Sequence, residues 1–283
     1  MRKKMIRVTD IKKGENKMNN KRDAMGDRFK EYEAVSNIKL TRRTPVILRL
    51  DMCHGHTFTR GFDKPFDKIF IYCMQETMKY LCEHIQGCAF GYTQSDEISL
   101  VLVDYKELET AAWFDNKIEK IYSVAASLAT FAFNKSFAEE YQYLVNKLKN
   151  TDNNFAYGLY DGLAKYKHSY ESGATFDCRC FNVPKEEVAN YFYWRQKDAV
   201  RNSIEATAQA NFSQKELQGK GQGELLEMLK NKGVMWFEIP LHEQRGAACL
   251  KTPGAGWSVT LNIPMFKGDE GRNFIERYIY VNE

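Results

Sequence analysis

Acidic residues that follow apolar segments of the sequence are placed where they could serve phosphoryl-transfer chemistry. Asp51 ends the apolar run 44–51, and Asp96 and Glu97 interrupt two further apolar runs. Two carboxylates at adjacent strand ends can bridge a pair of divalent cations. Such ions stabilise the attacking and leaving oxygens of an in-line phosphoryl transfer. From spacing alone, the alternative that each acid is an ordinary turn or helix-cap residue stays open.

These acids require a sheet that brings their strands together. We predict strands over 44–51, 88–93, 98–103 and 174–182, with helices over 65–86 and 113–133 between them. The second and third strands read as a hairpin. The order β-α-β-β-α-β is typical of a split βαβ, ferredoxin-like sheet, in which the first strand neighbours the central hairpin. We therefore expect an α+β fold with Asp51 beside the turn at Asp96 and Glu97.

The remaining segments complete this organisation. Residues 150–173 are polar and contain glycine, which predicts a loop. We predict further helices over 136–148, 184–209 and 214–230, and short strands over 234–238 and 257–263. The predicted organisation is a basic, flexible tail (1–24), a catalytic core that holds the acids (25–150) and the remainder of the same domain (151–283).

Composition and charge narrow the class of protein. The chain has 283 residues, of which 43% are hydrophobic, and it carries a net charge of +4. Nine basic and three acidic residues within 1–24 make the tail +6, so the body is −2. No apolar run approaches the roughly 20 residues of a membrane span, and no secretory signal follows the basic start. We expect a protein without a membrane partner.

The seven cysteines are odd in number and include no C-x-x-C pair. This pattern argues against a disulfide framework and against a structural zinc site. They favour a reducing, cytoplasmic compartment. Cys178 and Cys180 share one strand face and are interpreted as small buried side chains.

Several motifs, in order from Met25 to the C-terminus, resemble the tRNA-histidine guanylyltransferase family. They are Arg49-Leu50-Asp51, His56-x-Phe58, Lys64-Pro65, Tyr92-Thr93-Gln94-Ser95-Asp96-Glu97, Phe176-Asp177-x-Arg179, Trp194-Arg195-Gln196-x-Asp198 and Leu217-Gln218-Gly219. The chain is most similar to the bacterial and archaeal branch of guanylyltransferase-like 3′–5′ polymerases. It resembles that branch also in Arg201-Asn202-Ser203-Ile204 and Asn262-Ile263-Pro264-x-Phe266-Lys267.

The resemblance implies a fold like the palm of conventional polymerases, with helices on one face of the antiparallel sheet and a C-terminal α/β extension. It implies a homotetramer with two Mg²⁺ ions in each active site, ATP and GTP as substrates, and tRNA as the partner. In this family the 3′-hydroxyl of GTP, or of another templated nucleoside triphosphate, attacks the activated 5′ phosphate of tRNA and releases the leaving group.

The resemblance also implies roles for individual residues. Asp51, Asp96 and the backbone carbonyl of Met52 would bind metal, and Ser95 and Glu97 would flank that site. His56, Lys64, Lys117 and Lys120 would contact the nucleotide, the last two through its triphosphate. Asp177, Arg179, Arg195 and Asn202 would face the tRNA.

The sequence departs from the family pattern in the segment Asp51-Met52-Cys53-His54-Gly55-His56. Met52 replaces a glycine, which would be strained if the turn needs positive φ, and Gly55 replaces a phenylalanine. We expect metal binding to be retained and nucleotide affinity to be lower. The double substitution Met52→Gly with Gly55→Phe is expected to raise activity.

A second departure concerns the RNA substrate. Val200-Arg201-Asn202-Ser203 replaces the His-Ile-Asn-Asn stretch of eukaryotic members, so we expect templated repair of truncated tRNA 5′ ends more than dedicated guanylylation of tRNA-histidine. Two alternatives are a nucleotide cyclase built on the same palm and a catalytically impaired family member that binds tRNA.

Overall fold

The computed structural model describes residues 23–150 and 156–280. By its internal contacts the described chain divides between Asn37 and Ile38 into two units. In the first unit, helix α1 (Ala24–Ala34) begins at Asp23, whose Oδ1 accepts a hydrogen bond from the Gly26 amide at 3.0 Å. The predicted basic tail lies almost entirely outside the described residues.

The second unit is built on one antiparallel sheet with the strand order β4-β1-β3-β2-β5-β6. The strands are β1 (Val46–Met52), β2 (Cys88–Gln94), β3 (Glu97–Leu102), β4 (Phe176–Asn182), β5 (Ala247–Thr252) and β6 (Gly256–Thr260). The first four strands have the order of a split βαβ sheet. The predicted topology is therefore confirmed, and β5 and β6 extend the sheet beyond β2.

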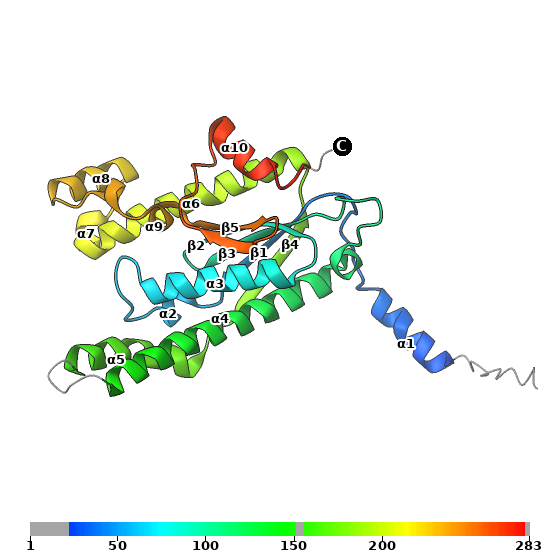
Figure 1. Cartoon of the computed structure of the whole chain (residues 1–283), viewed down its shortest axis with the longest axis horizontal. Helices are drawn as coiled ribbons and strands as arrows, with labels where there is room; N and C mark the ends of the chain where they lie inside the picture. The colour runs from blue at the N-terminus through cyan, green and yellow to red at the C-terminus, as the bar shows by residue number, and fades with distance from the viewer. Residues whose placement is uncertain (1–22, 151–155, 281–283) are drawn as a thin grey trace, which may run out of the picture. The chain divides into compact units, whose positions relative to one another are not determined.

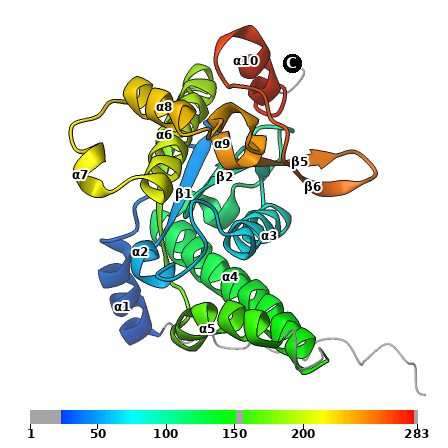
Figure 2. The same cartoon turned by 90° about the vertical axis from the view of Figure 1, so that its left-hand side faces the viewer.

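Helices cover both faces of this sheet, as Figures 1 and 2 show. Helices α3 (Lys68–His84) and α4 (Ile118–Lys149) pack against one face, where Leu48, Leu50 and Leu100 are fully buried. Helix α6 (Lys185–Asn211), which belongs to the C-terminal extension, packs against the other. The period-2 alternation of strand side chains explains both contacts.

The α6-facing side of the central strands changes character along their length. Ile47 and Val101 pack against α6 near one end, whereas Arg49, Asp51, Glu97 and Ser99 occupy the same side toward the other. On the α3/α4 side, Cys178 and Cys180 pack partly buried against the core, as predicted. All seven cysteines are free.

The remaining elements are helices and 3₁₀ turns of varied length. They are α2 (Gly55–Phe58), a 3₁₀ turn η1 (Trp113–Asn116), α5 (Ala156–Ser172), α7 (Gln214–Leu217), α8 (Gln222–Asn231), a second 3₁₀ turn η2 (Trp236–Glu238), α9 (Leu241–Arg245) and α10 (Gly268–Glu276). No helix in the described parts of the chain is both long enough and apolar enough to cross a membrane.

The predicted loop over 150–173 is wrong, because most of it is helix α5. Glycines disfavour a helix by about 1 kcal/mol each, but tertiary packing of one face outweighs this cost. Tyr166 is 4% exposed and its ring lies 4.9 Å from that of Phe62. Tyr170 stacks on Tyr141 at 4.2 Å between centroids.

Two other predicted boundaries also differ. α4 runs without a break through residues 133–136, because the side chain of Asn134 bonds to the backbone of Ala174 instead of interrupting the helix. The predicted strand at 234–238 is a 3₁₀ turn, in which the buried Trp236 donates its Nε1–H to Ser203 at 3.0 Å.

Gly91 permits the close approach of α3 to β2 and provides a test of this packing. A Cβ at this position would lie 2.6 Å from Sγ of Cys82 and 3.2 Å from Cγ of Met78. We expect Gly91→Ala to lower the free energy of unfolding by about 1–3 kcal/mol, measured by urea denaturation.

Cys82→Ala should restore part of that loss. Gly162→Ala is the control, because its Cβ would meet nothing within 4 Å. Equal stability of Gly91→Ala and the parent protein would contradict this account.

Candidate active site

The acids predicted from the sequence meet at one end of the sheet. Asp51 on β1 pairs in register with Glu97 on β3 and with Asp177 on β4. The β2–β3 turn carries Asp96, whose backbone carbonyl accepts the Met52 amide at 3.1 Å, and Ser95 turns the chain with φ of 49°. The expectation that Asp51 lies beside the hairpin turn is confirmed.

Negative charge is concentrated around Asp51. Burial and the nearby charges of Asp96, Glu97 and Asp177 together raise the pKa of Asp51 to about 6, although Arg49 opposes them. Such a cluster is stabilised by a cation. Asp51, Asp96 and the Met52 carbonyl are the oxygen donors that could hold one, although residues 23–150 and 156–280 contain no group of three His, Cys, Asp or Glu suited to a metal. A hard ion that keeps water and phosphate ligands fits so small a donor set.

Glu97 has a different environment from the other acids. It is 6% exposed, and Arg195 on α6 donates to its two oxygens at 2.8 and 2.7 Å. Burial raises the pKa of Glu97, and the two bonds from Arg195 counteract that effect. Ser99 also donates to Glu97 at 3.3 Å. The carboxylate of Glu97 is therefore engaged in fixing the turn to α6.

The residues that follow Arg195 extend this connection. The Gln196 side chain accepts the Phe266 amide at 2.6 Å and donates to the Pro264 carbonyl at 3.0 Å, which holds the 264–266 segment against α6. Asp198 accepts from Arg195 at 3.0 Å and pairs with Arg201. The W-R-Q-x-D motif thus joins three parts of the fold.

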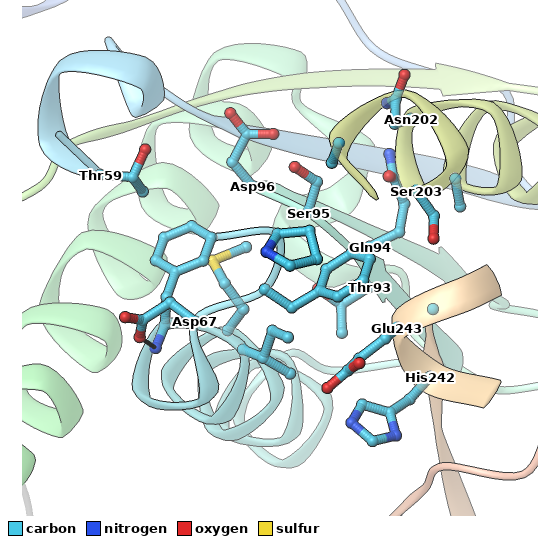
Figure 3. A pocket seen from close by; sticks show the side chains of 18 of the residues that line it. Thr59, Asp67, Thr93, Gln94, Ser95, Asp96, Asn202, Ser203, His242 and Glu243 are labelled. Carbon is cyan, nitrogen blue, oxygen red and sulfur yellow. Dashed lines mark hydrogen bonds between the residues drawn. The ribbon is translucent and has the colours of Figure 1, made fainter. Parts of the chain in front are cut away.

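Two cavities adjoin Asp96, one of about 330 Å³ and one of about 270 Å³, and both are lined by Gln94, Asp96 and Asn202. His56 and Lys64 line the larger cavity, as does Ser95, which Figure 3 shows beside Asp96. The smaller one is polar and contains Asp51, Glu97, Arg49, Arg179 and Arg195. Most of the predicted site residues are therefore brought together around Asp96.

Three predicted residues line neither cavity. Lys117 immediately precedes α4 and Lys120 lies in its first turn, on the side of the sheet opposite the α6-facing acids. The neighbouring Ile118 carbonyl accepts from Sγ of Cys180, which pairs with Leu48 and not with the Asp51 end of β1. Asp177 is exposed opposite Asp51 and lines neither cavity.

The sequence analysis missed the α9 wall of the larger cavity. His242 and Glu243 lie across the cavity from Asp67 (Figure 3). Gly246 follows them with φ of 83°, and a Cβ there would lie 2.5 Å from the Thr93 carbonyl. A glycine between a polar run and the apolar Ala247-Ala248-Cys249 was the available signal for this close contact.

The structure changes the interpretation of the departures at Met52 and Gly55. Met52 ends β1, is 3% exposed and pairs with Phe176, so positive φ is not required there. Gly55 adjoins Asp96, and a Cβ at this position would lie 2.4 Å from Oδ2 of Asp96. Met52→Gly would remove a core side chain and Gly55→Phe would displace Asp96. The expectation that this double substitution raises activity is therefore withdrawn.

Comparison with known protein families shows the family to which the chain belongs. The family described as tRNAHis guanylyltransferase matches residues 26–184, which is more than half of the chain. The chain belongs to this family. It is therefore a member of a nucleotidyltransferase family, and its palm-like fold agrees with that membership.

Members of the family with known structures support the same assignment. The chain is 38% identical to a bacterial tRNA(His) guanylyltransferase-like protein in complex with ATP, with a TM-score of 0.78 over 91% of this chain and 100% of the other. A bacterial tRNA(His) guanylyltransferase-like protein in complex with GTP is 35% identical, with a TM-score of 0.73 over 92% of this chain and 100% of the other. The guanylyltransferase from Saccharomyces cerevisiae shares the fold at 18% identity and a TM-score of 0.60, over 80% of this chain and 93% of that chain.

Curated relatives are more distant. An uncharacterised protein of Acanthamoeba polyphaga mimivirus is 28% identical over 81% of this chain and 77% of its own length. tRNA(His) guanylyltransferase 2 of Arabidopsis thaliana is 28% identical over 58% of this chain and 26% of its own length.

The buried Glu97–Arg195 pair predicts a pH-dependent loss of stability. Arg195→Met leaves the Glu97 charge without its partner, which should cost about 3–5 kcal/mol near neutral pH. Burial then holds the pKa of Glu97 above its unfolded value, so the folded state binds more protons and stability falls as pH rises. Urea denaturation should show a larger deficit at pH 8 than at pH 5.

Arg201→Met is the matched control. It removes an exposed partner of the same Asp198 and should change stability by no more than about 0.5 kcal/mol. A deficit of Arg195→Met that does not vary with pH would contradict the role given to Glu97.

Proposed function

We propose that this protein is a 3′–5′ nucleotidyltransferase that adds GTP or templated nucleoside triphosphates to the 5′ end of tRNA. The observation that carries the proposal is that Asp51 and Asp96 line the smaller cavity together, while Asp96 also lines the larger one, in a member of this family. His56 and Lys64 line the larger cavity together with Asp96, and they could contact a nucleotide there. The smaller one presents Arg49 and Arg179 to a phosphorylated RNA end, beside Arg195, which is engaged by Glu97 and Asp198.

The residues of the site have different roles in the proposed reaction. The 3′-hydroxyl of the bound nucleotide gives up its proton to water as its oxygen forms a bond to the activated 5′ phosphorus of tRNA, and the bond from that phosphorus to pyrophosphate or AMP breaks. Lys64, Arg49 and Arg179 would hold phosphate oxygens in place, and Arg195 would hold Glu97. Asp51, Asp96 and the Met52 carbonyl would hold Mg²⁺, two ions in each site, which when bound supplies charge neutralisation to the phosphates.

Templated repair is proposed in preference to dedicated guanylylation of tRNA-histidine. Val200 stands where eukaryotic members carry histidine, and it packs against the core formed by α6, α8 and Trp236. A side chain committed to that core is unsuited to reading an RNA base. The bacterial guanylyltransferase-like proteins, at 38% and 35% identity, also favour this branch.

Extension of a 5′-truncated, triphosphorylated tRNA by labelled GTP with Mg²⁺ tests the function. We expect the parent protein to extend this RNA, and Asp51→Ala and Asp96→Ala each to lower the rate by at least about 100-fold, since each removes a charge from the reacting centre. Glu139→Ala, an exposed acid on α4, is the control and should retain full activity.

The other outcomes distinguish the alternatives. A small-molecule product from nucleotide alone would indicate a cyclase, and tRNA binding without extension would indicate an impaired family member. Full activity in either aspartate variant would overturn the assignment of these carboxylates. A mature tRNA-histidine lacking its 5′ guanosine, used in parallel, compares guanylylation with repair.

Gly55 gives a separate test of the position of Asp96. Gly55→Ala should turn the Asp96 carboxylate away from its present position and reduce extension by about 10-fold or more, since even a small displacement at a reacting centre is costly. The rate is measured at saturating GTP over a range of Mg²⁺ concentrations. Gly223→Ala on α8, where a Cβ has no neighbour within 4 Å, is the control. An unchanged Mg²⁺ dependence in Gly55→Ala would contradict the account of Asp96.

A further inference from the structure

Helix α5, which none of the family motifs covers, contacts the wall of the larger cavity. Its buried Tyr166 donates from the hydroxyl to Oδ2 of Asp67 at 2.8 Å. The same oxygen accepts the Asp63 amide at 3.1 Å. The segment 63–67, which includes Lys64, lines the larger cavity. One hydroxyl on α5 is thus connected directly to the nucleotide-facing wall.

Asp67 is the junction at which this contact acts. It is 5% exposed, and its Oδ1 accepts the amides of Ile69 and Phe70 at 3.1 and 3.0 Å, which caps α3. A buried carboxylate depends on a full set of donors, because an unmade bond leaves it desolvated without compensation. Tyr166 therefore completes the donor set of the residue that joins the 63–67 segment to α3.

Two neighbours of Tyr166 hold the same region from adjacent points. Lys165 pairs with Asp63 at 2.5 Å, and Ser169 donates to the Phe58 carbonyl at the end of α2 at 2.5 Å. The ring of Tyr166 packs edge-on against Phe62, with centroids 4.9 Å apart. α5 thus contacts both ends of the stretch between α2 and α3.

We propose that Tyr166 is a positioning residue: its hydrogen bond to Asp67 fixes the 63–67 segment, and with it Lys64, and so sets the affinity of the larger cavity for a nucleoside triphosphate. This inference rests on the proposed function, because it assumes that the larger cavity binds the nucleotide. Asp63 and Lys64 are themselves exposed, so the segment owes its position to contacts such as this one. The other helices around the cavity supply residues that line it. Among the residues that the structure describes, α5 supplies none that lines the cavity, but it fixes the 63–67 segment, which does line it.

Tyr166→Phe isolates this hydroxyl, because phenylalanine keeps the ring packing against Phe62 and Phe137. We expect the dissociation constants of ATP and GTP to rise about 10-fold in the presence of Mg²⁺, since bonds to charged groups are among the stronger ones. The rate of tRNA extension at saturating GTP should change by less than about 2-fold, because Tyr166 touches no reacting atom. A rise in KM with kcat preserved is a result that a general loss of folding would not produce.

Tyr170→Phe is the matched control, since it removes a hydroxyl from the same helix. Tyr170 stacks on Tyr141 and accepts from Gln142 at 3.1 Å, away from the cavity. Binding is measured by equilibrium titration of the full chain with ATP and with GTP, and thermal unfolding of each variant is recorded alongside. Tyr170→Phe should bind both nucleotides like the parent.

The outcomes separate this inference from the proposed function. A parent protein that binds neither nucleotide would overturn the proposed function. A parent that binds, together with a Tyr166→Phe variant of unchanged affinity, would overturn the inference alone.

If Tyr166→Phe does not fold, Asp67→Asn replaces it, because it weakens the acceptor of the same hydrogen bond and nearly keeps the shape of the side chain. A rise of about 3-fold in the dissociation constant would support the inference, and an unchanged constant would overturn it. In an Asp67→Asn background, Tyr166→Phe should have a smaller effect than in the parent, and full additivity of the two changes would also count against the inference.

Discussion

The buried ion pair between Glu97 and Arg195 is the interaction on which the site depends. It joins the first residue of β3 to the middle of α6, and it therefore fixes the turn that carries Asp96. A buried pair of this kind gives little net stability, but it penalises strongly any arrangement that separates its members. Its contribution is therefore to geometry: α6 cannot slide along the sheet without leaving the buried charge of Glu97 unpaired.

The central topology could be predicted because each of its elements carries its own local signal. The apolar runs around Leu48 and Leu100 and the polar interruption at Asp96 are short-range patterns, and the βαββαβ order then fixes the neighbours of each strand. Helix α5 could not be predicted in this way. Its glycines and polar residues indicate a loop, and its stability comes from contacts with distant partners such as Phe62 and Tyr141.

The same distinction applies to the site. The pairing of Asp51 with Glu97 follows from strand order, whereas the contribution of His242 and Glu243 depends on how the C-terminal segment returns to β2, which no local pattern specifies. Met52 illustrates a third case. The family has a glycine where this chain has Met52. Here strand β1 continues through Met52, so the extended backbone at that position accepts a methionine. Resemblance alone could not distinguish these possibilities, because it compares residue types and not backbone conformations.

Asp96, Gln94 and Asn202 line both cavities, and this shared wall has a thermodynamic consequence. A ligand in one cavity that moves or neutralises Asp96 changes the binding free energy in the other. Linkage requires the effect to be reciprocal and equal in both directions. The order in which two substrates bind therefore cannot alter the stability of the ternary complex. It does determine which substrate binds to a cavity whose shared wall the first substrate has already changed.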